Sequence, residues 1–175
     1  MGVKGFRSPI KLKKIVIENP FTEKNKVLFE NGVFYDSNIF IRDSHLDIDI
    51  GNVFLISFLT PFRLIRNKIL ITEPKFRDLI AFLLRRYSAI RYQYIGDNLD
   101  VDVDNVLKKS EKVSTIYTSL TQKRFVYKNE EKIFLYGDMA FKGKLNSKLR
   151  KLICFGMLAH VGKMASFGYG WFKVV

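Results

Sequence analysis

The alternation of apolar and polar residues predicts strands near the start of the chain. Residues 10–17 alternate well enough to form a strand. Farther on, Asn31-Gly32 separates two short apolar runs, which predicts a hairpin with a type I′ turn because both central residues of that turn need a positive φ. We therefore expect residues 1–50 to form an N-terminal β-hairpin extension.

From Val53 onward, the periodicity alternates between that of strands and that of helices. The predicted elements are a strand over 53–60, a helix capped by Thr72 with Pro74 in its first turn, a short helix capped by Asp104, strands over 113–126 and 132–141 with a bulge at Gly137, a helix capped by Ser147, and a strand over 166–175. The main elements follow the order strand, helix, strand, strand, helix, strand. That order predicts an α+β, ferredoxin-like (RRM-like) βαββαβ domain over residues 51–175, with an antiparallel sheet and two helices on one face.

The two main predicted helices each carry one apolar face. The apolar positions of the first helix are Phe76, Leu79, Ile80, Leu83, Tyr87 and Ile90, and those of the second are Leu149, Leu152, Ile153 and Gly156. A glycine within the second stripe predicts a close approach between that helix and the element it covers. These faces are expected to pack against the sheet.

The charge of the chain indicates a polyanionic partner. The 175 residues include 30 Lys and Arg against 17 Asp and Glu, for a net charge of +13, and residues 141–175 contain no acidic residue. Such a balance is typical of proteins that bind nucleic acid, although a solvated basic face is the alternative. The lone Cys154 excludes an intrachain disulfide, and the longest apolar stretch, 53–59, is too short to cross a bilayer. We expect a cytoplasmic protein with no membrane partner, no metal and no cofactor.

A glycine-rich segment near the C-terminus is the strongest motif. It reads His160-Val161-Gly162, then five residues from Lys163 to Phe167, then Gly168-Tyr169-Gly170. Glycines allow backbone amides to approach a phosphate closely, and Lys163 and Ser166 add a charge and a hydroxyl. The alternative is structural: a helix end at Gly162 and a bulged strand farther on.

This segment resembles the C-terminal signature of the CRISPR repeat-RNA endoribonucleases, a family of the RAMP superfamily. That signature is Gly-apolar-Gly, five residues including Lys or Arg, then Gly-apolar-Gly, and here His160 replaces the first glycine. The stretch from Ile56 to Leu64, with its Thr-Pro, and the stretch from Phe134 to Met139, with its Gly-Asp, are similar to two further segments of the family. The resemblance covers about residues 53–175.

The resemblance implies a partner, CRISPR repeat RNA, and a reaction. Family members usually carry two ferredoxin-like domains and cut RNA without metal, by attack of a ribose 2′-hydroxyl on the adjacent phosphate. Their acid–base His usually lies in the N-terminal domain, and residues 1–50 are too few for such a domain. The chain is therefore expected to be the C-terminal, RNA-binding domain of a prokaryotic enzyme that processes precursor CRISPR RNA. The alternative is a non-catalytic subunit that scaffolds guide RNA among effector subunits, so the sequence leaves open whether this chain cuts RNA.

Individual residues can be assigned to these roles. The predicted RNA-binding residues are His160, Gly162, Lys163, Ser166, Gly168 and Gly170, with a basic track of Lys142, Lys144, Lys148, Arg150 and Lys151. His45 and His160 are weak catalytic candidates, because a histidine titrates near neutral pH. Four aromatic residues could either stack on bases or pack within the fold: Tyr117, Tyr136, Tyr169 and Trp171.

Overall fold

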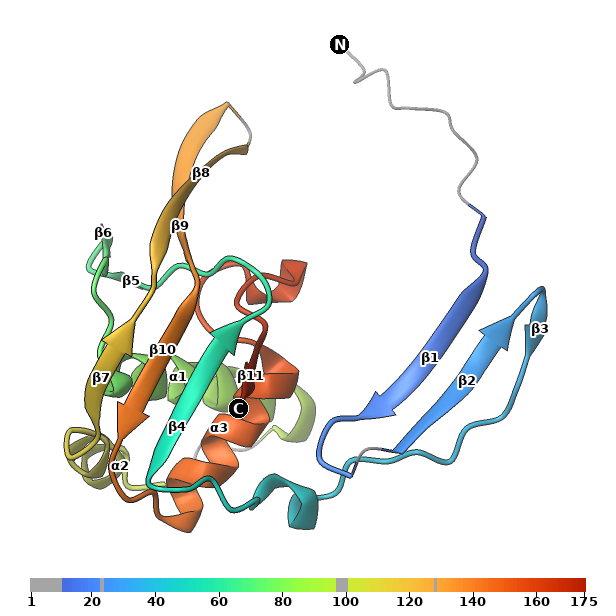
Figure 1. Cartoon of the computed structure of the whole chain (residues 1–175), viewed down its shortest axis with the longest axis horizontal. Coiled ribbons are helices and arrows are strands. Elements are labelled where there is room, and N and C mark those ends of the chain that lie inside the picture. The colour runs from blue at the N-terminus through green and yellow to red at the C-terminus, as the bar shows by residue number, and fades with distance from the viewer. Residues whose placement is uncertain (1–10, 23, 97–100, 128) are drawn as a thin grey trace. The chain divides into compact units, whose positions relative to one another are not determined.

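The chain forms two compact units in its computed structural model, residues 1–45 and residues 46–175 (Figure 1). The predicted boundary after residue 50 falls in the segment between Leu46 and the first strand of the second unit. The structure describes residues 11–22, 24–96, 101–127 and 129–175.

The first unit is an antiparallel sheet of three strands in the order β1-β2-β3. The strands are β1 (Lys14–Asn19), β2 (Lys24–Glu30) and β3 (Val33–Phe34). Asn31 and Gly32 have φ angles of 51° and 90°, so the predicted hairpin turn is confirmed. Strand β1 extends to Asn19, two residues beyond its predicted end, and residue 10 lies outside the described residues.

The second unit contains a sheet of four strands in the order β11-β4-β10-β7. The strands are β4 (Val53–Phe58), β7 (Ser114–Thr118), β10 (Asp138–Lys142) and β11 (Phe172–Val174). All neighbouring pairs are antiparallel, and when the four strands are numbered by their order in the chain, the order across the sheet is 4-1-3-2. This is the ferredoxin-like arrangement, so the predicted fold class is confirmed.

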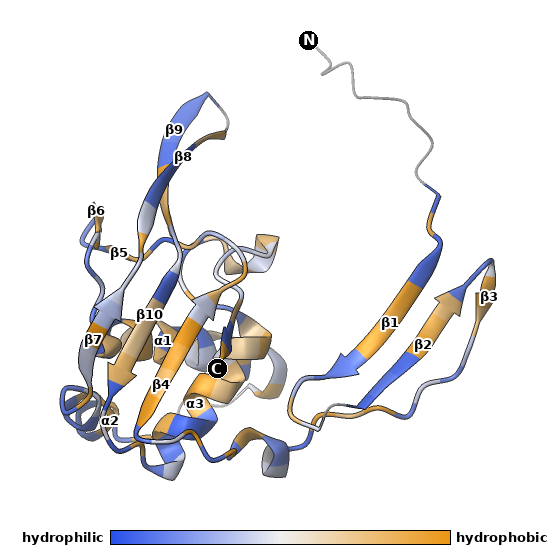
Figure 2. Ribbon diagram, in the orientation of Figure 1, coloured by the Kyte–Doolittle hydropathy of each residue, from blue (hydrophilic) through white to orange (hydrophobic). Residues whose placement is uncertain are grey.

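Both long helices, α1 (Phe76–Ile95) and α3 (Ser147–Ala159), cover the same face of this sheet (Figure 1). A shorter helix, α2 (Val103–Ser110), packs against them. The hydrophobic core lies between sheet and helices, and strand β4 contributes its apolar residues to it (Figure 2). The fully buried side chains are large, and they include Phe62, Phe76, Phe134, Phe141, Phe172, Ile80 and Leu149.

The glycine in the stripe of α3 makes the predicted close approach. A Cβ atom on Gly156 would lie 2.6 Å from Cδ2 of Leu83 in α1 and 2.8 Å from Cζ of Phe172 in β11. A side chain at this position would separate α3 from both elements, so glycine is required by packing.

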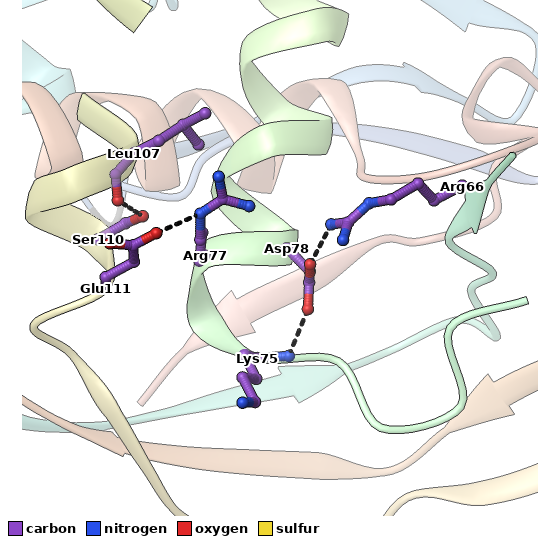
Figure 3. A network of polar contacts seen from close by, with 7 residues as sticks. All are labelled: Arg66, Lys75, Arg77, Asp78, Leu107, Ser110 and Glu111. Atoms are coloured by element: carbon purple, nitrogen blue, oxygen red, sulfur yellow. Dashed lines mark hydrogen bonds and ion pairs between the residues drawn. The ribbon is translucent and has the colours of Figure 1, made fainter. Parts of the chain in front are cut away.

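The start of α1 differs from the prediction. Its N-cap is Lys75, not Thr72, because Asp78 in the first turn accepts the backbone N–H of Lys75 at 2.9 Å. Arg66, in the short hairpin of β5 (Ile65–Arg66) and β6 (Ile69–Leu70), pairs with the same carboxylate (Figure 3). Arg77 pairs with Glu111 at 2.7 Å, which ties the end of α2 to the start of α1.

The two other predicted caps are wrong by one or two residues. The N-cap of α2 is Asp102, not Asp104, and that of α3 is Asn146, not Ser147. In each case the observed side chain accepts a hydrogen bond from the backbone N–H three residues later, at 3.0 Å and 2.9 Å respectively. A run of polar residues offers several caps to sequence reasoning, and this hydrogen bond selects one of them.

Three predicted strands were too long. The segment 113–126 divides into β7 and β8 (Thr121–Tyr127), and 132–141 divides at Gly137 into β9 (Glu130–Tyr136) and β10. Strands β8 and β9 pair with each other as a separate two-stranded hairpin that projects beyond the sheet (Figure 1). The segment 166–175 begins with the 3-10 turn η2 (Ala165–Phe167), and only its last part forms β11.

Candidate nucleic-acid interface

The glycine-rich loop, residues 160–171, connects α3 to β11 and lies against the segment that follows β4. Two backbone hydrogen bonds fix this contact: Lys163 N–H donates to the Arg63 carbonyl at 2.9 Å, and Gly170 N–H donates to the Pro61 carbonyl at 2.9 Å. Within the loop, Val161 N–H donates to the Gly170 carbonyl at 3.0 Å. The loop is therefore held in one shape by its own backbone and by residues 60–63.

Two of the three glycines are required by this backbone packing. A Cβ atom on Gly170 would lie 1.9 Å from the Val161 carbonyl oxygen, and one on Gly162 would lie 2.5 Å from the Arg63 carbonyl oxygen. Gly168 differs, because nothing lies within 4 Å of its Cβ position and only its φ of 85° favours glycine. The N–H groups of Gly168 and Gly170 already donate to protein carbonyls, so these two glycines can contribute to ligand binding only through the shape of the loop.

Thr60 explains why the Thr-Pro segment accompanies the glycine-rich loop. Its hydroxyl donates to the Gly168 carbonyl at 2.8 Å and accepts the backbone N–H of Trp171 at 2.9 Å. Together with the Pro61 carbonyl, it holds the second half of the loop. Two segments about 108 residues apart in sequence thus form one structural unit.

The loop presents polar and basic groups to solvent. Lys163 and Ser166 are both exposed, and Phe167 is 69% exposed beside them. A lysine ammonium and a serine hydroxyl are groups that bind phosphate oxygens. The structure thus places the two predicted polar ligands together on the outer surface of one loop.

His160 has a backbone conformation that glycine normally occupies. Its φ is 64° and its ψ is 167°, in a region that is essentially restricted to glycine and costs other residues about 1–3 kcal/mol. This accounts physically for the glycine that the family signature has here. The ring lies nearly parallel to that of Trp171, with 6.1 Å between centroids and 17° between planes.

The surroundings of the His160 ring favour its neutral form. Burial lowers the pKa of His160 below its ordinary value of 6.5, and the positive charge of Arg86 lowers it further. Backbone groups of Tyr169 and Ala165 act in the opposite direction. Among the residues that the structure describes, none forms a hydrogen bond with the buried Nδ1.

His45 lies in the first unit and has a local structural role. Its Nδ1 accepts the backbone N–H of Arg42 at 3.2 Å, and the Asn19 amide nitrogen lies 3.3 Å from the same atom. Because a backbone N–H only donates, Nδ1 must be the unprotonated nitrogen in this arrangement. These contacts close the turn η1 (Asp43–Leu46) onto the end of β1.

The fold separates the predicted basic track from the glycine-rich loop. Lys142 pairs with Val53, at the start of β4, whereas the glycine-rich loop contacts the residues after the end of β4. A strand of this length separates its ends by about 17 Å. The remaining members of the track, Lys144, Lys148, Arg150 and Lys151, follow Lys142 and belong to that other end.

Arg150 is engaged within the protein. Its Nε donates to Asp47 Oδ1 at 2.7 Å, while Ser147 Oγ donates to Oδ2 at 2.6 Å. Hydrogen bonds from Ser147 and then Arg150 hold the pKa of Asp47 below its ordinary value. This arrangement ties the segment before β4 to the start of α3. Lys142, Lys144 and Lys148 are exposed, so they are the accessible part of the predicted track.

Sequence reasoning missed the β8–β9 hairpin as a neighbour of the glycine-rich loop. Tyr169 of the loop stacks on Phe134 of β9 with 4.6 Å between centroids, and the Arg63 guanidinium lies 5.3 Å from the same ring. Two cationic side chains lie on β8: Lys123, whose ammonium group lies 4.4 Å from the Tyr136 ring centroid, and the exposed Arg124, which lies 3.6 Å from Glu131 of β9. The alternation of aromatic and basic residues along β8 and β9 could have suggested a binding surface. It could not have shown that this hairpin lies beside the glycine-rich loop.

The sheet order and the two helices on one face define a ferredoxin-like domain, and the loop that carries Lys163 and Ser166 lies at one end of its sheet. The family model described as CRISPR-associated endoribonuclease Cas6 matches residues 56–172. This match covers more than half of the chain, so the protein belongs to the Cas6 family. The family match supports a general role in the processing and binding of CRISPR RNA.

Solved structures agree on the fold. A Cas6 product complex has a TM-score of 0.55 and 15% identity, covering 71% of this chain and 52% of that chain. Thermus thermophilus Cas6 has a TM-score of 0.54 and 14% identity, with 71% and 53% covered. A partial Cas6-RT-Cas1–Cas2 complex has a TM-score of 0.55 and 7% identity, with 70% and 22% covered. The chain therefore spans about half the length of the first two structures. Comparison with curated proteins gives no match.

Two further observations concern the described residues alone. No helix among them is both long and apolar enough to cross a bilayer. No group of three or more His, Cys, Asp or Glu side chains in the same part of the chain is placed to hold a metal ion.

Proposed function

We propose that this chain binds CRISPR repeat RNA as the C-terminal domain of a metal-independent endoribonuclease that processes precursor CRISPR RNA. The observation that carries the proposal is the match to the Cas6 family over residues 56–172, which includes the whole contact between the Thr-Pro segment and the glycine-rich loop. At this end of the domain, Lys163 and Ser166 lie on the loop and the cationic side chains of β8 lie on the neighbouring hairpin. Phosphate groups of one RNA would contact both.

The acid–base residues of the reaction are proposed to lie in a companion domain. Attack of a ribose 2′-hydroxyl on the adjacent phosphate forms the bond from O2′ to phosphorus and breaks the bond to O5′, which leaves a 2′,3′-cyclic phosphate and a 5′-hydroxyl. One group must remove the 2′-hydroxyl proton, and another must protonate the leaving oxygen. Among the described residues, the ring of His45 has hydrogen bonds with the Arg42 backbone and the Asn19 amide, and the groups that shift the pKa of His160 are Arg86 and backbone groups. Neither histidine is therefore paired with a second acid or base in this part of the chain.

A binding titration tests the RNA proposal. Filter binding of labelled repeat RNA at several salt concentrations should give a log K that falls linearly with log salt, by roughly 0.7 for each phosphate contact on a single strand. Lys163→Ala should reduce that slope by about one contact. The matched control is Lys109→Ala, which removes an exposed lysine from the last turn of α2. Equal slopes for the two variants, or no salt dependence, would contradict the proposal.

The second candidate function is a non-catalytic subunit that scaffolds guide RNA in a CRISPR effector complex. The arrangement of the two histidines favours it, because a scaffold must bind RNA but does not require an acid–base pair. Both candidates predict that the pure chain binds labelled repeat RNA without cutting it. The deciding experiment therefore adds a companion domain that bears a histidine. Restored cleavage favours the endoribonuclease, and continued binding without cleavage favours the scaffold.

A further inference from the structure

Four aromatic residues are candidates for contact with RNA bases, and the fold assigns them different positions. Tyr169 is stacked on Phe134, and Tyr136 is half-buried beneath the ammonium group of Lys123. Tyr117 is 57% exposed, but it lies on β7, the edge of the sheet opposite β11, which is the strand that follows the glycine-rich loop. Trp171 is 46% exposed and is itself the last residue of that loop. Only Trp171 among the four is both exposed and part of the loop.

The backbone of Trp171 is fixed on both sides. Its N–H donates to the Thr60 hydroxyl at 2.9 Å, and its carbonyl accepts the N–H groups of Leu59 at 2.8 Å and Thr60 at 3.2 Å. A backbone held in this way has little conformational freedom left to lose when a ligand binds. An exposed aromatic side chain on such a backbone can serve as a stacking platform for bases.

His160 completes the site. Its ring lies nearly parallel to the Trp171 ring, and its strained backbone is held by the hydrogen bond from His160 N–H to the Gly156 carbonyl at 2.8 Å. Burial and the charge of Arg86 favour the neutral imidazole, which presents an uncharged aromatic ring beside the indole. Strain that is retained at one residue is a mark of function in folded proteins.

We propose that Trp171, with the His160 ring held parallel to it, is a stacking site for one unpaired nucleobase of the bound RNA. This proposal rests on the proposed RNA-binding function and specifies which part of the RNA the loop recognises. Lys163 and Ser166, on the same loop, would hold phosphate oxygens near that nucleotide. The base must be unpaired, because a base inside a duplex has both faces covered by its neighbours. Stacking tolerates any base, so the site selects single-stranded character and not sequence.

The protein contains one tryptophan, so its intrinsic fluorescence reports on this site alone. Short RNA with an unpaired segment should quench the Trp171 emission on binding. The same RNA with abasic positions throughout that segment should bind through its phosphates and quench far less. A fully paired duplex and heparin serve as polyanion controls and should leave the emission nearly unchanged.

Filter binding run in parallel tests RNA binding separately from base stacking. If no RNA binds, the proposed function fails. If RNA binds while the emission is unchanged, or if abasic RNA quenches as strongly as intact RNA, the stacking site is wrong and RNA binding stands. Because these measurements use the unaltered chain, they do not depend on whether any variant folds.

The RNA affinities of substituted proteins provide a second test of the stacking site. Trp171→Leu should weaken binding of the unpaired RNA roughly five- to a hundredfold, and Trp171→Phe should retain most of it. Tyr117→Leu is the control, since it removes an exposed aromatic ring from β7, the edge strand opposite β11. An equal loss in Trp171→Leu and Tyr117→Leu, or a loss in Tyr117→Leu alone, would overturn the assignment.

Discussion

Replacing His160 with glycine and with alanine tests whether the backbone at this position is strained. The residue has a φ of 64° and a ψ of 167° at the C-terminal end of α3. Alanine retains a Cβ atom and therefore the strain, whereas glycine adopts these angles freely. Both substitutions remove the imidazole ring, so the loss of its contacts cancels when the two variants are compared with each other.

The magnitude follows from two opposing effects. Relief of the strain favours glycine by about 1–3 kcal/mol. The greater freedom of glycine in the unfolded chain disfavours it by about 0.4–1 kcal/mol. We therefore expect His160→Gly to be more stable than His160→Ala by about 0.5–2 kcal/mol. In a protein of this size, that difference corresponds to roughly 1–8 °C in Tm.

Thermal unfolding followed by far-UV circular dichroism measures the difference. The control is Ala159→Gly, one residue earlier and still within α3, where glycine should lower the stability by roughly 0.5–1 kcal/mol. Glycine is thus expected to have opposite effects at two adjacent positions. If His160→Ala were as stable as His160→Gly, the strain would be absent and the inference from it would fail.

Other predictions concern the loop, the reaction and pH. Gly170→Ala should disrupt the loop and lower Tm strongly, because its Cβ would lie 1.9 Å from a carbonyl oxygen, whereas Gly168→Ala should cost only about 1–2 kcal/mol; equal losses would contradict this account. The chain alone should cut repeat RNA slowly or not at all, with or without EDTA, since missing acid–base catalysis typically costs about two to four decades of rate. Rapid cleavage that His45→Ala or His160→Ala abolishes would make this chain a complete nuclease. Since burial depresses the pKa of His160, the unfolded state binds a proton more readily, so stability should fall as pH drops below 6.5. His160→Gln should weaken that dependence in urea titrations across this range, and an unchanged profile would show that other groups cause it.

Patterns that depend on local backbone geometry were predicted well from the sequence. The Asn31-Gly32 turn is confirmed by its two positive φ angles. The apolar stripe Leu149, Leu152 and Ile153 is buried as the helical period predicts. In each case the information lies within a few neighbouring residues.

Predictions that depend on distant partners were incomplete. The cap of α1 was misplaced because the side chain that selects it, Asp78, acts from inside the helix and is itself held by Arg66. The projecting hairpin was missed because a strand pattern shows extended backbone and not the strand with which it pairs. The two hydrogen bonds of Thr60 could not be foreseen from either segment separately.

The sequence by itself determined the order of elements, the excess of positive charge and the spacing of glycines, because these are properties of composition and local periodicity. The tertiary structure decided which residues share a surface. It joined Thr60 to the glycine-rich loop, placed Trp171 beside His160, and set Lys142 at the opposite end of β4 from Lys163. The reason is that an antiparallel sheet brings together residues that are remote along the chain and separates the ends of each strand, and neither relation is visible in one-dimensional spacing.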